Sequence, residues 1–260
     1  HDPLGVPFYN APLWGEEVVV GLDTIIGGVD GIGQGWQMLM QSLSVGRGIS
    51  LPSTSTGGTK LTARVVGNYA KIRHQFGLNI GKFEGIEEAM ARVGANAYML
   101  EAARKYTIGA IDAGLKPAVI NAIMKYQATE KYRESINDGM DILGGAGISR
   151  GERNLLAHAY VGAPIAITVE GANIMTRTLI VFGQGVIRCH PYAYKEIEAL
   201  INSDITQFDR NFFAHVHFTT QNAIRACALN LSRGHFHRPT LKGELGRIEQ
   251  KLVWTSAKFA

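Results

Sequence analysis

The sequence contains little cysteine and no long apolar run, and both absences narrow the class of protein. Only two of its 260 residues are cysteines, Cys189 and Cys227, which lie far apart and in neither a metal-binding nor a CxxC spacing. This argues against a disulfide framework and a zinc site, and it favours a reducing compartment. No apolar run reaches the roughly 18 residues that a membrane-spanning helix needs, and the first residues show no signal-peptide pattern.

Charge is scarce as well, and it is unevenly spread. Charged residues make up 18% of the chain and hydrophobic residues 46%, a balance typical of a folded soluble protein. The net charge of +4 comes entirely from residues 201–260, which hold eight Lys and Arg against four Asp and Glu. This segment has no dense Lys or Arg run, so nucleic-acid binding is not favoured. Its aromatic residues predict packing onto the bundle, with contact to a membrane surface as an alternative: Phe212, Phe213, Phe218 and Trp254.

The first thirty residues differ from the rest. They carry Pro3, Pro7 and Pro12, and then a strand-like run at residues 17–22. This pattern predicts the end of an incomplete β-domain at residues 1–30. The chain opens without Met and stops within an apolar helical pattern, so we expect a fragment of a longer protein.

From residue 35 onward the apolar periodicity is helical. It predicts helices at about 36–74, 86–113, 117–140 and 170–187, followed by 206–231 and another from about 242. Pro52 predicts a kink, and Gly114 a helix end. Long helices joined by short connections indicate a mainly α fold, with an antiparallel four-helix bundle at residues 31–192 and an extra, truncated helical domain at 193–260.

The stretch from Thr168 to Arg177 contains the strongest candidate for catalysis. Glu170 follows an apolar approach at residues 163–167 and precedes Gly171, at the expected start of a helix. A carboxylate among apolar groups is a candidate general base, because desolvation raises its pKa toward working pH. Gly171 allows close approach of a substrate, and a backbone N–H there could bind a carbonyl oxygen. The alternative is a surface Glu that the helix dipole stabilises.

Two further motifs suggest contacts to a phosphorylated ligand. The first runs from Arg73 through His74, Gln75 and Phe76 to Gly77, where a guanidinium fork and an amide suit phosphate. The second is Asp141-Ile142-Leu143-Gly144-Gly145, where paired glycines let the backbone approach a ligand. Each motif is equally consistent with an ordinary helix end.

The order and spacing of the three motifs resemble the C-terminal helical domain of the acyl-CoA dehydrogenase family. The resemblance covers residues 15 to 190. The segments 208–209, 222–225 and 231–234 are similar to the extra C-terminal domain of the family's bacterial long-chain branch.

The resemblance implies FAD-dependent α,β-dehydrogenation of fatty acyl-CoA thioesters to trans-2-enoyl-CoA in β-oxidation. In the family, a Glu at the position of Glu170 removes the α-proton, and the β-hydrogen passes as hydride to flavin N5. The backbone N–H of that Glu and a ribityl hydroxyl bind the thioester carbonyl, so Gly171 and Arg47 are expected on the substrate side. The expected location is the cytoplasm, with peripheral contact to the inner membrane as an alternative.

The resemblance also implies cofactor contacts and partners. The residues expected to contact FAD are Arg73, His74, Gln75, Asp141, Ile142, Leu143, Gly144, Gly145, Ala172, Asn173 and Ile174. Some of these contacts reach the flavin of a neighbouring subunit in the family, which implies a homo-oligomer. The other implied partners are acyl-CoA and an electron-transferring flavoprotein or another electron acceptor.

Some family members carry the base on the first long helix, where this chain has Gly46. No Asp or Glu occurs between Asp30 and Glu84, so Glu170 is the remaining candidate. The chain departs from the family at Val169, where an aromatic residue is usual, at Ala172, where Thr is usual, and at Asp141, where Gln is usual. An oxidase of the same fold and a non-catalytic nucleic-acid-binding flavoprotein remain alternatives.

The histidines of the last sixty residues predict no metal site. His215 and His217 are two positions apart on an expected helix and therefore point in different directions, and His235 and His237 have the same spacing. We expect no carboxylate partner near them and a structural role for all four.

Overall fold

The structure is a computed structural model of the 260-residue chain and describes residues 5, 11–115 and 117–258. It divides into two compact units, residues 1–183 and 184–260, whereas the sequence places the division after residue 192. Both units are mainly helical, which confirms the predicted fold class.

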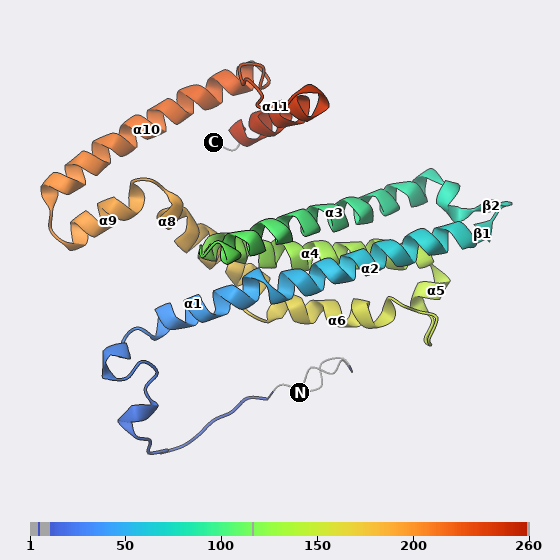
Figure 1. The fold of residues 1–260 in the computed structure, drawn as a ribbon, viewed down its shortest axis with the longest axis horizontal. Coiled ribbons are helices and arrows are strands. Elements are labelled where there is room, and N and C mark those ends of the chain that lie inside the picture. The colour runs from blue at the N-terminus through green and yellow to red at the C-terminus, as the bar shows by residue number, and fades with distance from the viewer. Residues whose placement is uncertain (1–4, 6–10, 116, 259–260) are drawn as a thin grey trace. The chain divides into compact units, whose positions relative to one another are not determined.

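The first unit is built from long helices that run side by side (Figure 1). These are α1 (Gly35–Gly48), α2 (Ser50–Ile72), α3 (Glu84–Asp112), α4 (Ala118–Leu143) and α6 (Ala157–Thr168). Helices α2, α3 and α4 pack against one another, while α1 and α6 pack against α4. Because short connections reverse the chain between α2, α3 and α4, these helices are antiparallel, as the bundle prediction requires.

The apolar stripes predicted for α3 and α4 form the core of this bundle. Val93 of α3 lies in one buried cluster with Val66 of α2 and Ile142 of α4. Met124 and Ala128 of α4 form a second cluster with Leu100 of α3. Ile120, at the beginning of α4, is 42% exposed and lies outside both clusters.

The predicted breaks agree with the local chemistry of the chain. A proline at position 52 has no N–H to donate to the carbonyl of Gly48, and its ring crowds that carbonyl. The helix accordingly breaks at Ile49, between α1 and α2. At the end of α3, Gly114 adopts a positive φ of 80° and donates to the carbonyl of Ile111, as expected of a glycine that ends a helix.

A small hairpin connects α2 to α3. Strand β1 (His74–Gln75) pairs antiparallel with β2 (Leu78–Asn79), with His74 opposite Asn79 and Gln75 opposite Leu78. The two turn residues, Phe76 and Gly77, both have positive φ, which this kind of two-residue turn requires. The hairpin carries the Arg73 motif beyond the end of α2.

Two predictions for this unit are wrong. Residues 17–22 form no strand, because an extended segment needs a neighbouring strand to complete its ladder, and none pairs with it among the described residues. The helix expected at 170–187 does not begin at Glu170. Helix α6 ends at Thr168, a turn follows, and the chain resumes as α7 (Asn173–Met175) and a π-helix, η5 (Thr176–Val186).

The second unit contains α8 (Ile187–Cys189), α9 (Ala193–Ile201), α10 (Ile205–Leu231) and α11 (Gly243–Ala257). Helices α9 and α11 each pack against α10 (Figure 1). The carboxylate of Asp204 caps α10 by accepting the N–H of Gln207 at 2.9 Å. Asp is a typical residue directly before a helix, because its carboxylate accepts a backbone N–H of the first turn.

Two tail histidines have carboxylate partners, contrary to the sequence expectation. Nδ1 of His215 lies 2.8 Å from Oε1 of Glu196, and Nε2 of His237 lies 2.8 Å from Oε1 of Glu249. Each pair joins residues from two different helices, or from a loop and a helix. The partners are separated in the sequence and meet only in the folded chain, so the sequence did not predict these contacts. Across the described ranges, no three His, Cys, Asp or Glu side chains come together as a metal-binding set.

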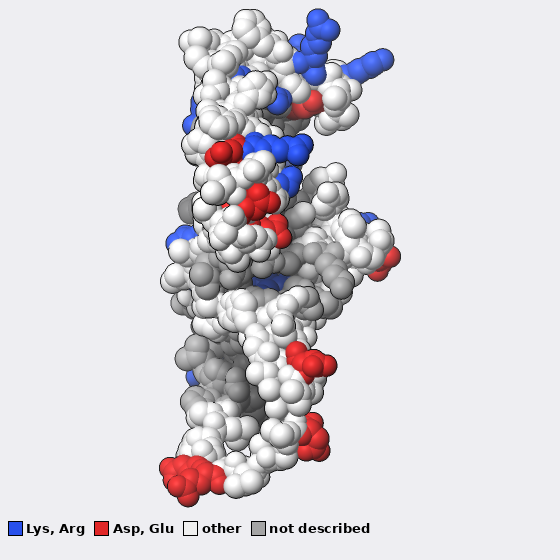
Figure 2. Space-filling view, turned by 90° about the vertical axis from the view of Figure 1, so that its left-hand side faces the viewer, with Lys and Arg blue, Asp and Glu red and all other residues white. Residues whose placement is uncertain are grey.

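The aromatic side chains of this unit have different surroundings. Phe218 packs edge-on against the rings of His190 and Tyr192, whereas Phe213 is 67% exposed in this unit. On the face shown in Figure 2, Lys and Arg side chains are interspersed with carboxylates and uncharged residues. No single described helix is long and apolar enough to cross a bilayer. Ala157–Thr168 and Asn173–Gly183 reach that length and composition only as a pair bent by 45°.

Candidate active site

The turn between α6 and α7 holds Glu170 in an unusual backbone conformation. Glu170 has φ of 54° and Gly171 has φ of 88°. A left-handed conformation is rare for a residue with a side chain, and strain of this kind persists only where the surroundings impose it. Consecutive positive φ values also explain why no helix begins at Glu170.

Three donors from outside the turn hold its backbone. The guanidinium of Arg47, on α1, donates from Nε to the carbonyl of Glu170 at 2.6 Å. The ammonium of Lys125, on α4, donates to the carbonyl of Gly171 at 2.8 Å. The hydroxyl of Thr176 donates to that same carbonyl at 3.2 Å. These bonds provide the restraint that the strained conformation needs.

The carboxylate of Glu170 lies against helix α1 at Gly46. A Cβ at position 46 would stand 3.0 Å from Oε1 and 3.2 Å from Oε2 of Glu170, so glycine leaves the room that this carboxylate occupies. Oε2 is buried and accepts no hydrogen bond from the described residues. A buried carboxylate oxygen without a donor is costly for stability, and such groups gather at functional sites.

The electrostatic environment of Glu170 combines burial with two cations. Burial raises the pKa of the carboxyl above its ordinary value, and the charges of Arg47 and Lys125 act in the opposite direction. Both cations are themselves buried: Arg47 is 4% exposed and Lys125 is fully enclosed. A carboxyl whose pKa lies above its ordinary value is a stronger base than an exposed carboxyl, which suits proton abstraction.

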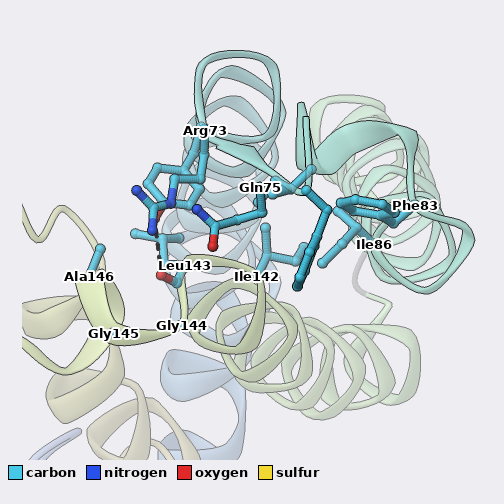
Figure 3. Close-up of a pocket in the computed structure, with 12 residues that line it drawn as sticks. Arg73, Gln75, Phe83, Ile86, Ile142, Leu143, Gly144, Gly145 and Ala146 are labelled. Atoms are coloured by element: carbon cyan, nitrogen blue, oxygen red, sulfur yellow. Dashed lines mark hydrogen bonds between the residues drawn. The ribbon is translucent and has the colours of Figure 1, made fainter. Parts of the chain in front are cut away.

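The second candidate site is a pocket of about 560 Å³ at the end of the bundle where the hairpin lies. Figure 3 shows Arg73 and Gln75 extending from the hairpin side toward Ile142 and Leu143, with Gly144, Gly145 and Ala146 along one edge. Tyr69, Phe76, Ile80, Phe83 and Ile86 complete the lining. Two motifs about seventy residues apart in the sequence therefore meet in one pocket.

The glycine pair suits close approach of a ligand to the backbone. Gly144 has φ of 55°, and a Cβ on either Gly144 or Gly145 would meet no atom within 4 Å. The open space beside these glycines faces a guanidinium that matches phosphate geometry. The residues present therefore fit a phosphorylated ligand with a flat apolar portion.

The structure brings together most of the residues that the sequence singled out, in two groups. Arg47, Glu170 and Gly171 form one group at the turn after α6, and Arg73, Gln75 and residues 142–145 line the pocket. His74 and Asp141 lie next to the pocket in sequence but are exposed and absent from its lining.

The three residues 172–174, expected to contact FAD, differ in their exposure to solvent. Ala172 and Ile174 are exposed, whereas Asn173 is buried at 3% exposure. The Asn173 side chain bonds to Lys125, Thr129 and Glu130, so it faces the bundle interior.

Sequence reasoning missed Lys125 and helix α6. The available signal for Lys125 was a polar stripe on α4, in which Asn121, Lys125 and Thr129 recur every four residues beside the apolar stripe. Helix α6 was hidden by Pro164, which usually ends a helix but here lies inside one. The fold and its sites thus define a helical-bundle domain with a half-buried candidate base and a separate ligand pocket.

Two family descriptions match the chain. "Acyl-CoA dehydrogenase, C-terminal domain" matches residues 33–183, and "Acyl-CoA dehydrogenase, C-terminal, bacterial type" matches residues 187–260. The first match covers more than half of the chain and includes both candidate sites. The chain belongs to the acyl-CoA dehydrogenase family, which confirms the resemblance noted in the sequence, including its bacterial-type C-terminal region.

Solved structures agree with this assignment. Butyryl-CoA dehydrogenase from Megasphaera elsdenii is 27% identical, with a TM-score of 0.53 over 60% of this chain. An acyl-CoA dehydrogenase from Geobacillus kaustophilus is 22% identical, with a TM-score of 0.55 over 58% of this chain, and supports the fold alone. In each case the alignment covers 39% of the other protein.

A curated relative, Protein HemX from Proteus mirabilis, is 58% identical over 67 residues, which are 26% of this chain and 39% of that protein. This match covers too little of either protein to carry a functional argument. The chain spans about two fifths of the length of the relatives compared here.

Proposed function

We propose that this chain is the part of a flavin-dependent acyl-CoA dehydrogenase that supplies the catalytic base, Glu170, for oxidation of fatty acyl-CoA thioesters to trans-2-enoyl-CoA. The observation that carries the proposal is the Glu170 carboxylate. One of its oxygens is buried and has no donor among the described residues, and its turn is held in a strained conformation by buried Arg47 and Lys125. Membership of the family supports the reaction class.

The chemistry divides between the residues of the chain and the cofactor. Glu170 takes the α-proton, and the electron pair of that C–H bond goes into the new carbon–carbon double bond. FAD, when bound, supplies the acceptor for the β-hydrogen, which leaves as hydride. The substrate is thereby oxidised by two electrons, and no further co-reactant is needed for this half of the reaction.

Removal of an α-proton places negative charge on the thioester oxygen, which needs fixed donors. The backbone N–H of Glu170 is suited to this role, because it lies next to the base and donates to no acceptor among the described residues. Arg47 supports this geometry from behind by holding the Glu170 carbonyl. The base and the oxyanion donor therefore belong to one residue.

The pocket at the hairpin is proposed to bind the phosphate-bearing part of FAD through Arg73, Gln75 and the Gly144–Gly145 backbone. It lies at the opposite end of α2 from the base. At 1.5 Å per residue, the 18 residues from Lys125 to Leu143 on α4 span about 27 Å. A flavin whose reactive ring lies beside Glu170 would have to extend over this whole distance to reach the pocket of the same chain. We therefore propose a homo-oligomer in which each pocket serves a neighbouring subunit.

The direct test uses the full-length protein with bound FAD, mixed anaerobically with palmitoyl-CoA and with shorter acyl-CoAs. The proposal expects loss of the oxidised flavin absorbance and formation of the enoyl-CoA in equal amounts. A flavin that stays oxidised with all chain lengths would reject the proposed function.

The rate of flavin reduction is expected to rise with pH along an acid limb that lies above the ordinary carboxyl range. Only ionised Glu170 can accept the α-proton, and burial raises its pKa, so a larger fraction is protonated and inactive at mildly acidic pH. Stopped-flow reduction rates at saturating acyl-CoA would locate this limb. A rate that stays constant down to pH values near 4.5, the ordinary value of the carboxyl, would contradict the assignment.

Replacing Arg73 with Ala is expected to weaken FAD retention by about tenfold or more and to shift the protein toward smaller oligomers, because charge-assisted hydrogen bonds to phosphate are lost. The measurements are flavin per chain after gel filtration and mass by light scattering. Lys71→Ala is the matched control, since this cation of the last turn of α2 does not line the pocket. Equal flavin content and equal mass in both variants would refute the assignment of the pocket.

A further inference from the structure

Lys125 is a fully buried cation at the centre of the first unit. Among the residues that the structure describes, it is the largest side chain that is completely buried. Lysines are rarely buried unless their three donors are all satisfied, because removing an ammonium from water is costly. We therefore expect all three donors of Lys125 to have acceptors, and these acceptors indicate the role of the residue.

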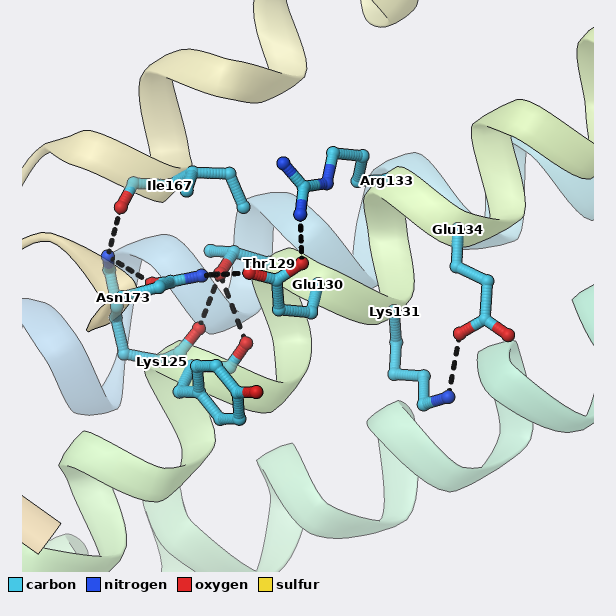
Figure 4. A network of polar contacts seen from close by, with 9 residues as sticks. Lys125, Thr129, Glu130, Lys131, Arg133, Glu134, Ile167 and Asn173 are labelled. Carbon is cyan, nitrogen blue, oxygen red and sulfur yellow. Dashed lines mark hydrogen bonds and ion pairs between the residues drawn. The ribbon is translucent and has the colours of Figure 1, made fainter. Parts of the chain in front are cut away.

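The three donors of Lys125 bind three oxygens on both sides of Glu170. They reach the carbonyl of Gly171 at 2.8 Å, and the carbonyl of Ile167 at 3.2 Å and Oδ1 of Asn173 at 2.7 Å, both of which Figure 4 shows. Ile167 belongs to the last turn of α6, where carbonyls lack helical partners and a cation is favourable. Asn173 is the first residue of α7. One ammonium thus joins the end of one helix to the start of the next.

A second set of hydrogen bonds orients Asn173. Its amide Nδ2 donates to Oγ1 of Thr129 and to Oε1 of Glu130, both at 2.9 Å. These partners leave Oδ1 of Asn173 facing Lys125. Because Lys125 and Thr129 lie one helical turn apart on α4, a single rigid helix supplies this whole support.

Lys125 acts on Glu170 through its charge as well as through its hydrogen bonds to the turn. The charged groups that shift the pKa of Glu170 are Arg47 from α1 and Lys125 from α4, and both lower it against the effect of burial. Burial lowers the pKa of Lys125 to about 8, with Arg47 acting in the same direction and Glu170 and Glu130 opposing it. Lys125 therefore carries its charge at neutral pH.

We propose that Lys125 is a positioning residue for the base: it clamps the turn on both sides of Glu170 and holds the carboxylate over Gly46. The inference rests on the proposed function of Glu170 and adds a residue to it. Lys125 contacts backbone oxygens and an amide, not the reacting atoms, so it acts through Glu170. Asn173 and Thr129 act through Lys125 in the same way.

The test replaces Lys125 with Met, which has a similar length and no donors, in the full-length protein. Flavin reduction by acyl-CoA is expected to slow by at least about 100-fold, because a displaced base loses the geometry for proton transfer. The affinities for FAD and acyl-CoA are expected to stay within about threefold. The acid limb of the rate profile should move to higher pH, since one of the two cations that lower the pKa of Glu170 is absent.

Lys131→Met is the matched control. Lys131 lies on the same helix and forms a surface ion pair with Glu134 at 2.6 Å, so its loss should change neither the rate nor the acid limb (Figure 4). Amide hydrogen exchange over residues 165–177 gives a readout that does not depend on turnover. It should speed up in Lys125→Met and stay unchanged in Lys131→Met.

Several outcomes overturn the proposal. They are a reduction rate in Lys125→Met within about threefold of the unmodified protein, an acid limb that does not move, or unchanged exchange in the turn. If Lys125→Met does not fold, Thr129→Val serves instead, since it keeps Lys125 and removes one acceptor of Asn173. That variant should reduce flavin more slowly and exchange faster in the turn without any shift of the acid limb, and unchanged values reject the clamp.

Failure of the proposed function is distinguishable from failure of the clamp. An unmodified protein that reduces no flavin with acyl-CoA rejects the role of Glu170, whereas the exchange comparison still reports whether Lys125 holds the turn.

Discussion

Replacing Glu170 with Gln is expected to slow flavin reduction by acyl-CoA by at least about 1,000-fold, the upper part of the range for loss of a general base. Gln has nearly the same shape as Glu but cannot accept the α-proton. The amide keeps the volume beside Gly46 filled, so the affinities for FAD and acyl-CoA should stay within about threefold. Single-turnover reduction under anaerobic conditions separates the chemical step from substrate binding.

The control for this variant is Glu152→Gln. Glu152 is an exposed carboxylate in the loop that precedes α6, so its replacement should leave the rate unchanged. The thermal stability of Glu170→Gln should equal or exceed that of the unmodified protein, because a buried oxygen without a donor no longer carries charge. Reduction by Glu170→Gln within about tenfold of the unmodified rate would show that another group takes the proton.

The second large effect is expected from moving the base to α1. A Cβ at position 46 would stand 3.0 to 3.3 Å from the carboxylate atoms of Glu170, so a glutamate at position 46 can reach the same region from the other side. We expect the double variant Gly46→Glu with Glu170→Ala to reduce flavin at least about 100-fold faster than Glu170→Ala alone. The double variant should remain slower than the unmodified protein. Arg47 and Lys125 position the turn that carries Glu170, but they would not position a glutamate side chain on α1.

The matched control keeps the size of the new side chain and removes its basicity. Gly46→Gln with Glu170→Ala should show no recovery, because the amide cannot accept a proton. Gly46→Glu alone should be slower than the unmodified protein, since two carboxylates would compete for one space and one would hold a proton. Equal activity of the Glu and Gln double variants would mean that proximity to α1 does not define the position of the base.

The candidate base could be predicted from the sequence more completely than the pocket could. Glu170 could be named because its neighbours are apolar and its motif resembles that of the family. The other position where family members carry the base is Gly46 here, and residues 31–83 contain no Asp or Glu. The two halves of the pocket, around Arg73 and Gly144, could be named by their chemistry. Their meeting could not be read from the residues alone, since it depends on how α2 and α4 pack.

Predictions of local structure failed where distant groups decided the conformation. Glu170 was expected to start a helix, but its left-handed conformation is held by Arg47, which lies 123 positions away, and by the Lys125 bond to Gly171, 46 positions away. Residues 17–22 have strand-forming side chains and form no strand, because a ladder requires a second chain segment. The carboxylate partners of His215 and His237 were missed for the same reason.

The sequence by itself determined the helical bundle, the breaks near Pro52 and Gly114, and the identity of the candidate base. Helix periodicity, proline geometry and the freedom of glycine act within a few residues, and so they are written in the local sequence. Only the tertiary structure decided that Lys125 is buried, that its ammonium clamps the turn, and that one oxygen of Glu170 has no donor among the described residues. Burial and long-range hydrogen bonds belong to the packed chain, because they exist only after α1, α4 and α6 have come together.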